Sequence, residues 1–140
     1  MREKISVVMT TYNGEKYLLE QLESLRNQTL EIDEVIIMDD CSKDETPKRI
    51  RKYIEDNSLN GWKLIENQTN QGWKKNFKLG FDLAMGDYIF PCDQDDIWHL
   101  DKVQKMTECM KRHPEIELLA ANYITFFSEN DTGSGSKLYA

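Results

Sequence analysis

Three carboxylates stand within four positions of the sequence, at Asp93, Asp95 and Asp96. They follow a short apolar run at residues 88–90, which is typical of a buried strand. Carboxylates spaced as Asp-x-Asp in a turn can direct oxygen atoms at one divalent cation. Mg²⁺ and Mn²⁺ favour carboxylates together with the phosphate oxygens of a ligand. The spacing therefore points to a metal-assisted site for a phosphate-bearing ligand.

Polar side chains also end two earlier apolar runs. Residues 10–13 (TTYN) close the first run, and Asp39 and Asp40 close the second. Ligands of open α/β sheets bind beyond the carboxyl ends of the strands, so we expect the three polar groups to form one site. The ring of Tyr12 could stack on a base, and the carboxylate of Asp40 could accept a base N–H. Together they suggest a nucleoside diphosphate bound through a metal, although each alone could be an ordinary loop or capping group.

Several other kinds of site are disfavoured. The sequence contains neither G-x-G-x-x-G nor G-x-x-x-x-G-K-[ST], which counts against dinucleotide dehydrogenases and P-loop enzymes. A calcium loop starting at Asp93 would need Gly in place of Trp98 and Glu in place of Gln104. The net charge of −7 argues against nucleic acid as a partner.

Strand and helix patterns alternate along the chain. Apolar runs predict strands, and apolar residues at helical spacing separate them. Short connections between such elements favour a mostly parallel sheet with helices on both faces, an α/β fold. Asp44 is the expected N-cap of the second helix. The strands are predicted at residues 4–10, 34–38, 62–65, 88–90 and 116–121.

The remaining composition fits one domain. We expect that domain over residues 1–127, followed by a flexible polar tail over 128–140. The three cysteines match no metal-binding spacing, and no apolar run suits a signal peptide or a membrane span. Both observations favour reduced thiols and a cytoplasmic location. Trp73 and Trp98 could line an acceptor groove, but packing in or at the edge of the core is the stronger expectation for each.

Four stretches in order resemble family 2 inverting glycosyltransferases of GT-A fold, particularly bacterial rhamnosyltransferase-like members. They are ISVVMTTYNGEKYLLEQLESLRNQT, DEVIIMDDCSKDET, NQGWKKNF and GDYIFPCDQDDIW. The resemblance covers about residues 4–124 and implies a Rossmann-like GT-A domain, of which this chain would be the N-terminal, nucleotide-binding part. It also implies transfer of a sugar from a nucleotide-diphosphate donor to a hydroxyl acceptor, with inversion at the anomeric carbon.

The resemblance assigns nucleotide-binding roles by position. Thr10 and Tyr12 resemble the strand end that binds the base, Asp40 the carboxylate that reads the base edge, and Asp39 a support of that loop. Lys75, which follows Gly72, resembles a diphosphate or base contact.

Asp93-Gln94-Asp95 resembles the family's Asp-x-Asp motif. Asp95 would bind Mn²⁺ or Mg²⁺, and Asp93 would contact ribose, sugar or metal. The donor would be UDP- or dTDP-linked, and the acceptor a glycan or lipid-linked glycan, with peripheral membrane association of the full-length protein. The family's general base is an Asp or Glu that would fall beyond residue 140.

Two other functions stay open from the sequence. The chain could be a non-catalytic nucleotide-sugar-binding module, which would bind donors without turnover. It could also be a sugar nucleotidyltransferase, but that activity would want a Gly-rich loop with Arg after the first strand. Residues 11–14 (TYNG) do not supply such a loop.

Overall fold

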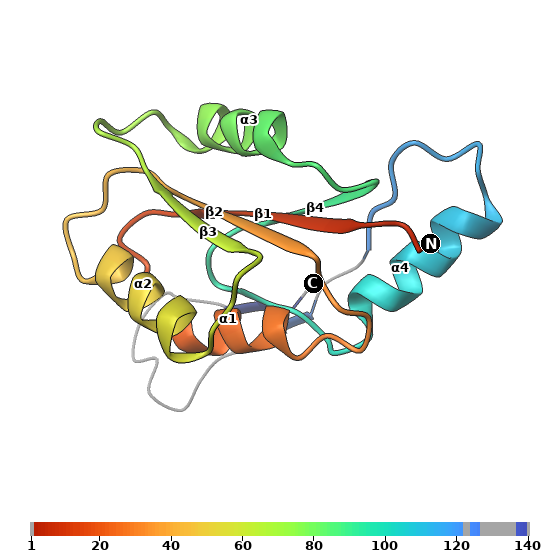
Figure 1. Cartoon of the computed structure of the whole chain (residues 1–140), viewed down its shortest axis with the longest axis horizontal. Helices are drawn as coiled ribbons and strands as arrows, with labels where there is room; N and C mark the ends of the chain where they lie inside the picture. Colours follow the sequence, from red (N-terminus) through yellow and green to blue (C-terminus); the bar gives the residue numbers. More distant parts are fainter. Residues whose placement is uncertain (1, 122–123, 127–136, 140) are drawn as a thin grey trace. The chain divides into compact units, whose positions relative to one another are not determined.

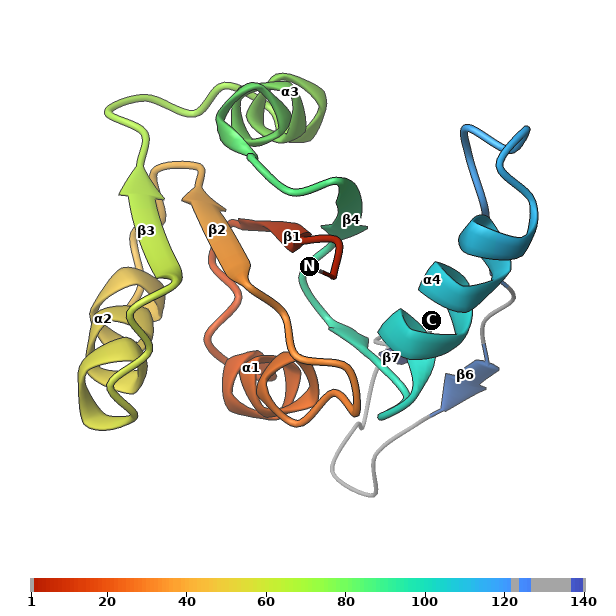
Figure 2. The same cartoon turned by 45° about the vertical axis from the view of Figure 1, so that its right-hand side comes forward.

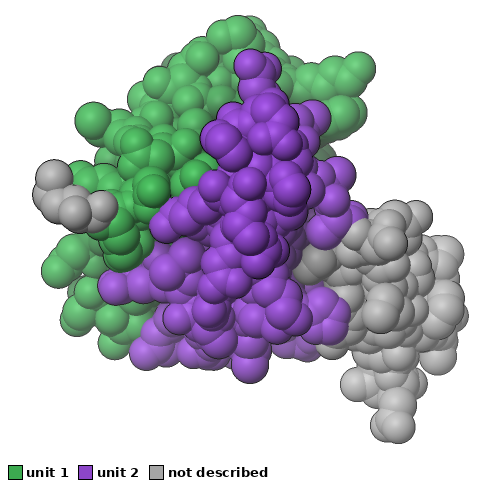
Figure 3. Space-filling model, turned by 90° about the vertical axis from the view of Figure 1, so that its right-hand side faces the viewer, with its two compact units in different colours: residues 1–18, 32–94 green, residues 19–31, 95–140 purple. Residues whose placement is uncertain are grey.

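The computed structural model describes residues 2–121, 124–126 and 137–139. The described chain divides into two compact units, coloured separately in Figure 3. The first unit comprises residues 1–18 and 32–94, and the second comprises residues 19–31 and 95–140.

The first unit is built on a four-stranded parallel sheet with strand order β3-β2-β1-β4. Its strands are β1 (Ile5–Thr11), β2 (Glu34–Asp39), β3 (Trp62–Glu66) and β4 (Tyr88–Cys92). All of β1 and all of β2 after Glu34 are buried, as the continuous apolar runs predict. In the register, Thr11 lies opposite Asp39, and Met9 lies opposite Cys92. The last residues of these strands therefore reach the same edge of the sheet.

Helices α2 (Thr46–Asp56) and α3 (Trp73–Leu83) lie on opposite faces of this sheet, as Figures 1 and 2 show. The α3 side of the sheet has a core of Val8, Ile36 and Met38. A Cβ atom on Gly80 would lie only 2.3 Å from Cγ1 of Val8, so α3 packs directly on the sheet at this glycine. The predicted α/β arrangement with helices on both faces is confirmed.

The second unit contains two helices, α1 (Leu18–Arg26) without its first residue and α4 (Lys102–Arg112). Gln28, 8% exposed, connects the two helical segments. Its Nε2 donates to the carbonyl oxygen of His99 at 2.7 Å, and its Oε1 accepts a bond from the Val103 N–H at 3.0 Å. The unit also has a small sheet with strand order β5-β7-β6, formed by β5 (Asp96–Ile97), β6 (Ile124–Phe126) and β7 (Lys137–Tyr139).

The structure corrects two sequence-based predictions. No strand forms over residues 116–121, where Leu118 is 88% exposed; an apolar run without a neighbouring strand to pair with stays irregular. Helix α2 begins at Thr46 with Glu45 at the N-cap position, although a carboxylate oxygen of Asp44 accepts the Thr46 N–H at 3.0 Å. The predicted tail over 128–140 lies mostly outside the described residues, and within it Lys137–Tyr139 form β7.

No helix in the described ranges is long and apolar enough to cross a membrane.

Candidate functional site

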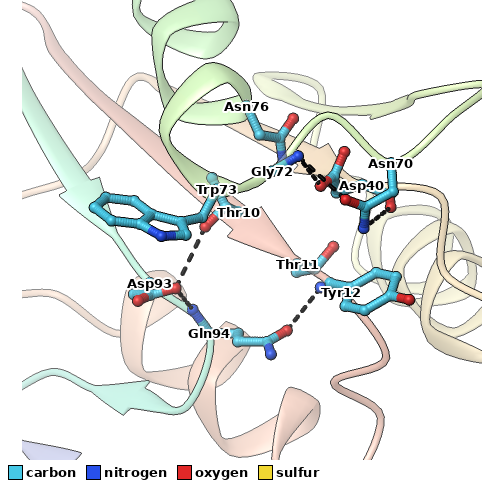
Figure 4. Close-up of a pocket in the computed structure, with 10 residues that line it drawn as sticks. All are labelled: Thr10, Thr11, Tyr12, Asp40, Asn70, Gly72, Trp73, Asn76, Asp93 and Gln94. Atoms are coloured by element: carbon cyan, nitrogen blue, oxygen red, sulfur yellow. Dashed lines mark hydrogen bonds between the residues drawn. The ribbon is translucent and has the colours of Figure 1, made fainter.

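A pocket of about 490 Å³ lies at the carboxyl ends of β1, β2 and β4 (Figure 4). The order in which strands are added to the sheet reverses here. The chain places β2 and β3 on one side of β1 and then β4 on the other side of β1. Such switch points are where open α/β sheets bind their ligands. Among the sequence-predicted residues, Thr10, Tyr12, Asp40 and Asp93 line the pocket. The remaining lining residues are Thr11, Asn70, Gly72, Trp73, Asn76 and Gln94.

Hydrogen bonds join the ends of β1 and β4. The backbone N–H of Tyr12 donates to Oε1 of Gln94 at 2.7 Å. The Thr10 hydroxyl lies 3.4 Å from Oδ1 of Asp93, an oxygen that also accepts the Gln94 N–H at 2.9 Å. The Tyr12 side chain is 44% exposed, so its ring is available to a ligand.

Asp40 organises the loop that leads into α3. It is 4% exposed, and its carboxylate accepts the N–H of Gln71 at 2.7 Å and the N–H of Gly72 at 2.9 Å. The side chain of Asn67 donates to the same carboxylate at 3.0 Å. Gly72 has φ +85°, a conformation that residues with a Cβ rarely adopt. Asp40 thus shapes the wall of the pocket as well as lining it.

Asp39 acts from behind the pocket. It is 1% exposed and is not a lining residue. Its carboxylate accepts the Thr11 hydroxyl at 2.8 Å, the Ser42 hydroxyl at 2.6 Å and the Ser42 N–H at 2.9 Å. Asp39 therefore joins the end of β1 to the loop after β2, beside the pocket.

The loop after β1 is attached to the residues before α2. The N–H of Gly14 donates to the Thr46 hydroxyl at 3.0 Å, and the N–H of Glu15 donates to Asp44 at 3.5 Å. Burial raises the pKa of the Asp44 carboxyl, but hydrogen bonds from Thr46 and Glu15 outweigh it and leave the pKa below its usual 3.8. Asp44 therefore stays ionised and keeps these contacts at neutral pH.

Sequence reasoning missed the role of Asn76, a fully buried polar residue on α3. Its amide donates to the Met38 carbonyl oxygen at 2.8 Å, and its Oδ1 accepts a bond from Asn67 at 2.8 Å. These contacts tie the start of α3 to the end of β2. The sequence did contain a signal for this role. Asn76 stands four residues before Gly80, and this spacing puts it on the same helix face as the glycine, the face that packs on the sheet.

The predictions for the two tryptophans and for Lys75 do not all agree with the positions of these residues in the structure. Trp98 is 2% exposed, as expected for core packing. Trp73 is 65% exposed and lines the pocket, so the expectation of core or edge packing is wrong for this residue. Lys75 is exposed on the first turn of α3 but does not line the pocket.

Asp95 lies outside the pocket lining and in the second unit, directly after the boundary at Gln94. Its φ of +71° is one that Asp tolerates better than most residues. The described residues contain no group of three or more His, Cys, Asp or Glu side chains arranged for a metal. Two carboxylates two positions apart do fit the donor chemistry of a hard divalent cation, which completes its shell with ligand phosphates and water.

The chain is similar to known proteins in both sequence and structure. The family described as "Glycosyl transferase family 2" matches residues 6–137. The putative glycosyltransferase EpsE of Bacillus subtilis is 31% identical over 123 residues, which cover 88% of this chain and 44% of EpsE.

Two solved structures have the same fold. The structure of S. aureus TarS 1-349 in complex with UDP-GlcNAc is 31% identical, with a TM-score of 0.71, covering 79% of this chain and 32% of that chain. A mannosyltransferase from Pyrobaculum calidifontis, in complex with GDP-Man and Mn²⁺, is 24% identical, with a TM-score of 0.73, over 79% of this chain and 33% of that one. At this identity the second likeness concerns the fold alone. The chain spans between 28% and 44% of the length of the curated relatives it matches.

Proposed function

The chain belongs to glycosyl transferase family 2, and we propose that its pocket binds the nucleotide part of a nucleotide-diphosphate sugar. The whole protein would transfer that sugar to a hydroxyl acceptor. The observation that carries the proposal is the convergence of Tyr12, Asp40 and Asp93, from three strand ends, on one pocket. TarS, which is similar over 79% of this chain, has been crystallised with a nucleotide sugar.

The base is assigned to the side of the pocket where Tyr12, Asp40 and Asn70 lie (Figure 4). The exposed ring of Tyr12 offers a face for stacking. Each carboxylate oxygen can accept more than one hydrogen bond, so Asp40 can receive a base N–H while it holds Gln71 and Gly72. The diphosphate would then extend toward Asp93.

We assign Asp95 and Asp93 to the binding of Mn²⁺ or Mg²⁺. When bound, the ion would stabilise the negative charge that the departing nucleoside diphosphate acquires. The hydroxyl of Thr10 and the N–H of Gln94 fix the Asp93 carboxylate at the pocket edge. That contact orients the carboxylate before a ligand arrives.

Inversion requires a general base that removes the acceptor proton on the face opposite the leaving group. The two lining carboxylates, Asp40 and Asp93, already have roles on the nucleotide side. We therefore propose that the base, and the pocket for a glycan or lipid-linked acceptor, come from residues outside this chain. UDP- and dTDP-linked sugars are the proposed donors, and the cytoplasmic face of the membrane is the proposed place of action.

Calorimetry with UDP, dTDP and GDP, each with and without Mn²⁺, tests the binding step. We expect one of them to bind more tightly with Mn²⁺. Tyr12→Ala should weaken that binding by about 1–3 kcal/mol, the usual value of aromatic stacking on a base. Tyr12→Phe keeps the ring and serves as the matched control. Failure of the wild-type chain to bind any of the three with Mn²⁺ would contradict the proposal.

Turnover separates an enzyme from a binding module. Release of nucleoside diphosphate from a nucleotide sugar should be measured with this chain and with a version extended to the length of its relatives. We expect the short chain to bind without turnover and the longer one to transfer sugar. Binding without turnover by both would favour a non-catalytic module.

A further inference from the structure

Trp73 is an unusually exposed aromatic residue at the edge of the pocket. It begins α3 and is 65% exposed. Its side chain lines the nucleotide pocket and also a second hollow of about 410 Å³ formed with Phe77, Phe81 and Pro91. A large aromatic ring at the mouth of a pocket is exposed to water in the unbound protein. A ligand that covers the ring removes its apolar surface from water, which favours binding.

The position of Trp73 within the pocket indicates which part of a bound nucleotide sugar it would contact. Figure 4 shows Trp73 and Asp93 on one side of the pocket and Tyr12, Asp40 and Asn70 on the other. A nucleotide sugar is built in the order base, ribose, diphosphate, sugar. With the base beside Tyr12, the part of the donor that reaches Trp73 is the diphosphate or the sugar.

The chemistry of the ring separates these two parts. The face of an aromatic ring carries partial negative charge, so it disfavours phosphate oxygens and favours the weakly positive C–H bonds on one face of a pyranose. The ammonium group of Lys74 lies 5.4 Å from the centre of the Trp73 ring. This cation lies over one face of the ring, so a sugar would stack on the opposite face.

We propose that Trp73 is the surface on which the sugar ring of the donor stacks, and that it selects sugars with an apolar C–H face. The inference rests on the proposed binding of a nucleotide sugar and adds the residue that contacts the transferred group. It separates the two aromatic side chains of the pocket by role: Tyr12 takes the base and Trp73 the sugar.

The test compares nucleotides with and without the sugar. Affinities of wild type, Trp73→Ala and Trp73→Phe are measured with Mn²⁺ for UDP, dTDP and GDP and for the nucleotide sugars UDP-glucose, UDP-GlcNAc, dTDP-rhamnose and GDP-mannose. Trp73→Ala should weaken the best-bound nucleotide sugar about tenfold, in the range of aromatic stacking, and change the affinity of its parent diphosphate less than about twofold. Trp73→Phe should retain most of the affinity. Leu83→Ala, at an exposed position on the same helix that lines neither hollow, is the matched control.

The outcomes are distinguishable. Equal weakening of the diphosphate and the nucleotide sugar would assign Trp73 to the nucleotide and overturn the proposal, as would unchanged affinities in Trp73→Ala. Wild type that binds the diphosphates but none of the nucleotide sugars would also overturn it. If wild type binds no nucleotide at all, the proposed function itself fails. Saturation-transfer NMR adds a second readout: sugar-ring protons should receive saturation in wild type and lose it in Trp73→Ala, whose thermal melt checks folding.

Discussion

The Asp40 carboxylate and the backbone N–H of Gly72, 32 residues apart in sequence, form a 2.9 Å hydrogen bond. With the neighbouring bond from the N–H of Gln71, it fastens the loop before α3 to the end of β2. The loop carries Asn70 and Gly72 into the pocket wall. The residue proposed to read the base therefore also builds the surface on which the base would lie.

Asp40→Asn should impair both stability and ligand binding. An amide has one oxygen, so its NH₂ group would face the Gln71 N–H, which would lose its acceptor, or the Gly72 N–H, which would keep only its longer 3.2 Å bond to Oδ1 of Asn70. A buried unpaired donor costs about 1–3 kcal/mol, and we expect urea unfolding to show a loss of this size. Calorimetry should show weaker binding of UDP, dTDP and GDP alike, because the loop is displaced.

A different pattern would separate the two roles of Asp40. If the Asn variant keeps wild-type stability but changes the preference among the three bases, the carboxylate acts on the base alone. Asp82→Asn, a change at an exposed carboxylate on α3, is the control for the loss of one charge.

Asp95→Asn should remove most of the Mn²⁺ dependence of nucleotide binding. Asn tolerates the left-handed backbone of Asp95, with φ +71°, so the fold should be preserved while a charged metal ligand is lost. Calorimetry with UDP and dTDP, each titrated with and without Mn²⁺ and then with EDTA, measures the effect. Asp96→Asn is the matched control one position away. Retention of the full Mn²⁺ effect in Asp95→Asn would remove Asp95 from the metal site.

Gly80→Ala should destabilise the first unit. The added Cβ would stand 2.3 Å from Cγ1 of Val8 and 3.0 Å from Cγ of Met38, so α3 must move away from the sheet. Overpacking of this kind costs about 1–3 kcal/mol, which outweighs the gain in helix propensity from Gly to Ala. Urea unfolding measures the loss. Leu79→Ala changes the adjacent, 37% exposed position and should alter stability much less. A Gly80→Ala chain as stable as wild type would show that α3 does not pack as described.

Glu34 should contribute to the loss of stability in acid. Burial raises the pKa of its carboxyl, but hydrogen bonds from the Ser6 hydroxyl and the Met85 N–H, together with Lys63, outweigh burial and leave the pKa below its usual 4.5. The folded state therefore binds the proton less tightly than the unfolded state does. The stabilisation is present above the usual pKa and is lost as the pH falls through the lower, folded value.

The free energy of unfolding, measured by urea between pH 3 and pH 7, tests the Glu34 prediction. Glu34→Gln should be less stable than wild type at pH 7 and should lose less stability than wild type on acidification. Glu117→Gln, at an exposed position, should follow the wild-type curve. Parallel curves for wild type and Glu34→Gln would mean that Glu34 titrates alike in both states.

The parallel sheet was predictable because its signals are local. The apolar runs of β1 and β2 and the polar residues that end them stand next to each other in the sequence. Parallel strands direct their carboxyl ends to one edge, so the meeting of Tyr12, Asp40 and Asp93 followed from strand order along the chain. The strand expected at residues 116–121 failed because an apolar run needs a partner to become a strand, and pairing is a property of the fold.

The sequence by itself therefore determined the fold class, the family and four of the residues that line the pocket walls. Only the tertiary structure decided how those residues are used. It showed that Asp39 supports the pocket from behind, that Asp40 holds Gly72, and that Asn76 joins α3 to β2. It also placed Trp73 at the mouth of the pocket. The physical reason is that residue type and spacing specify which groups a strand end presents, whereas hydrogen-bond partners and exposure depend on segments more than 25 residues apart, which meet only in the folded chain.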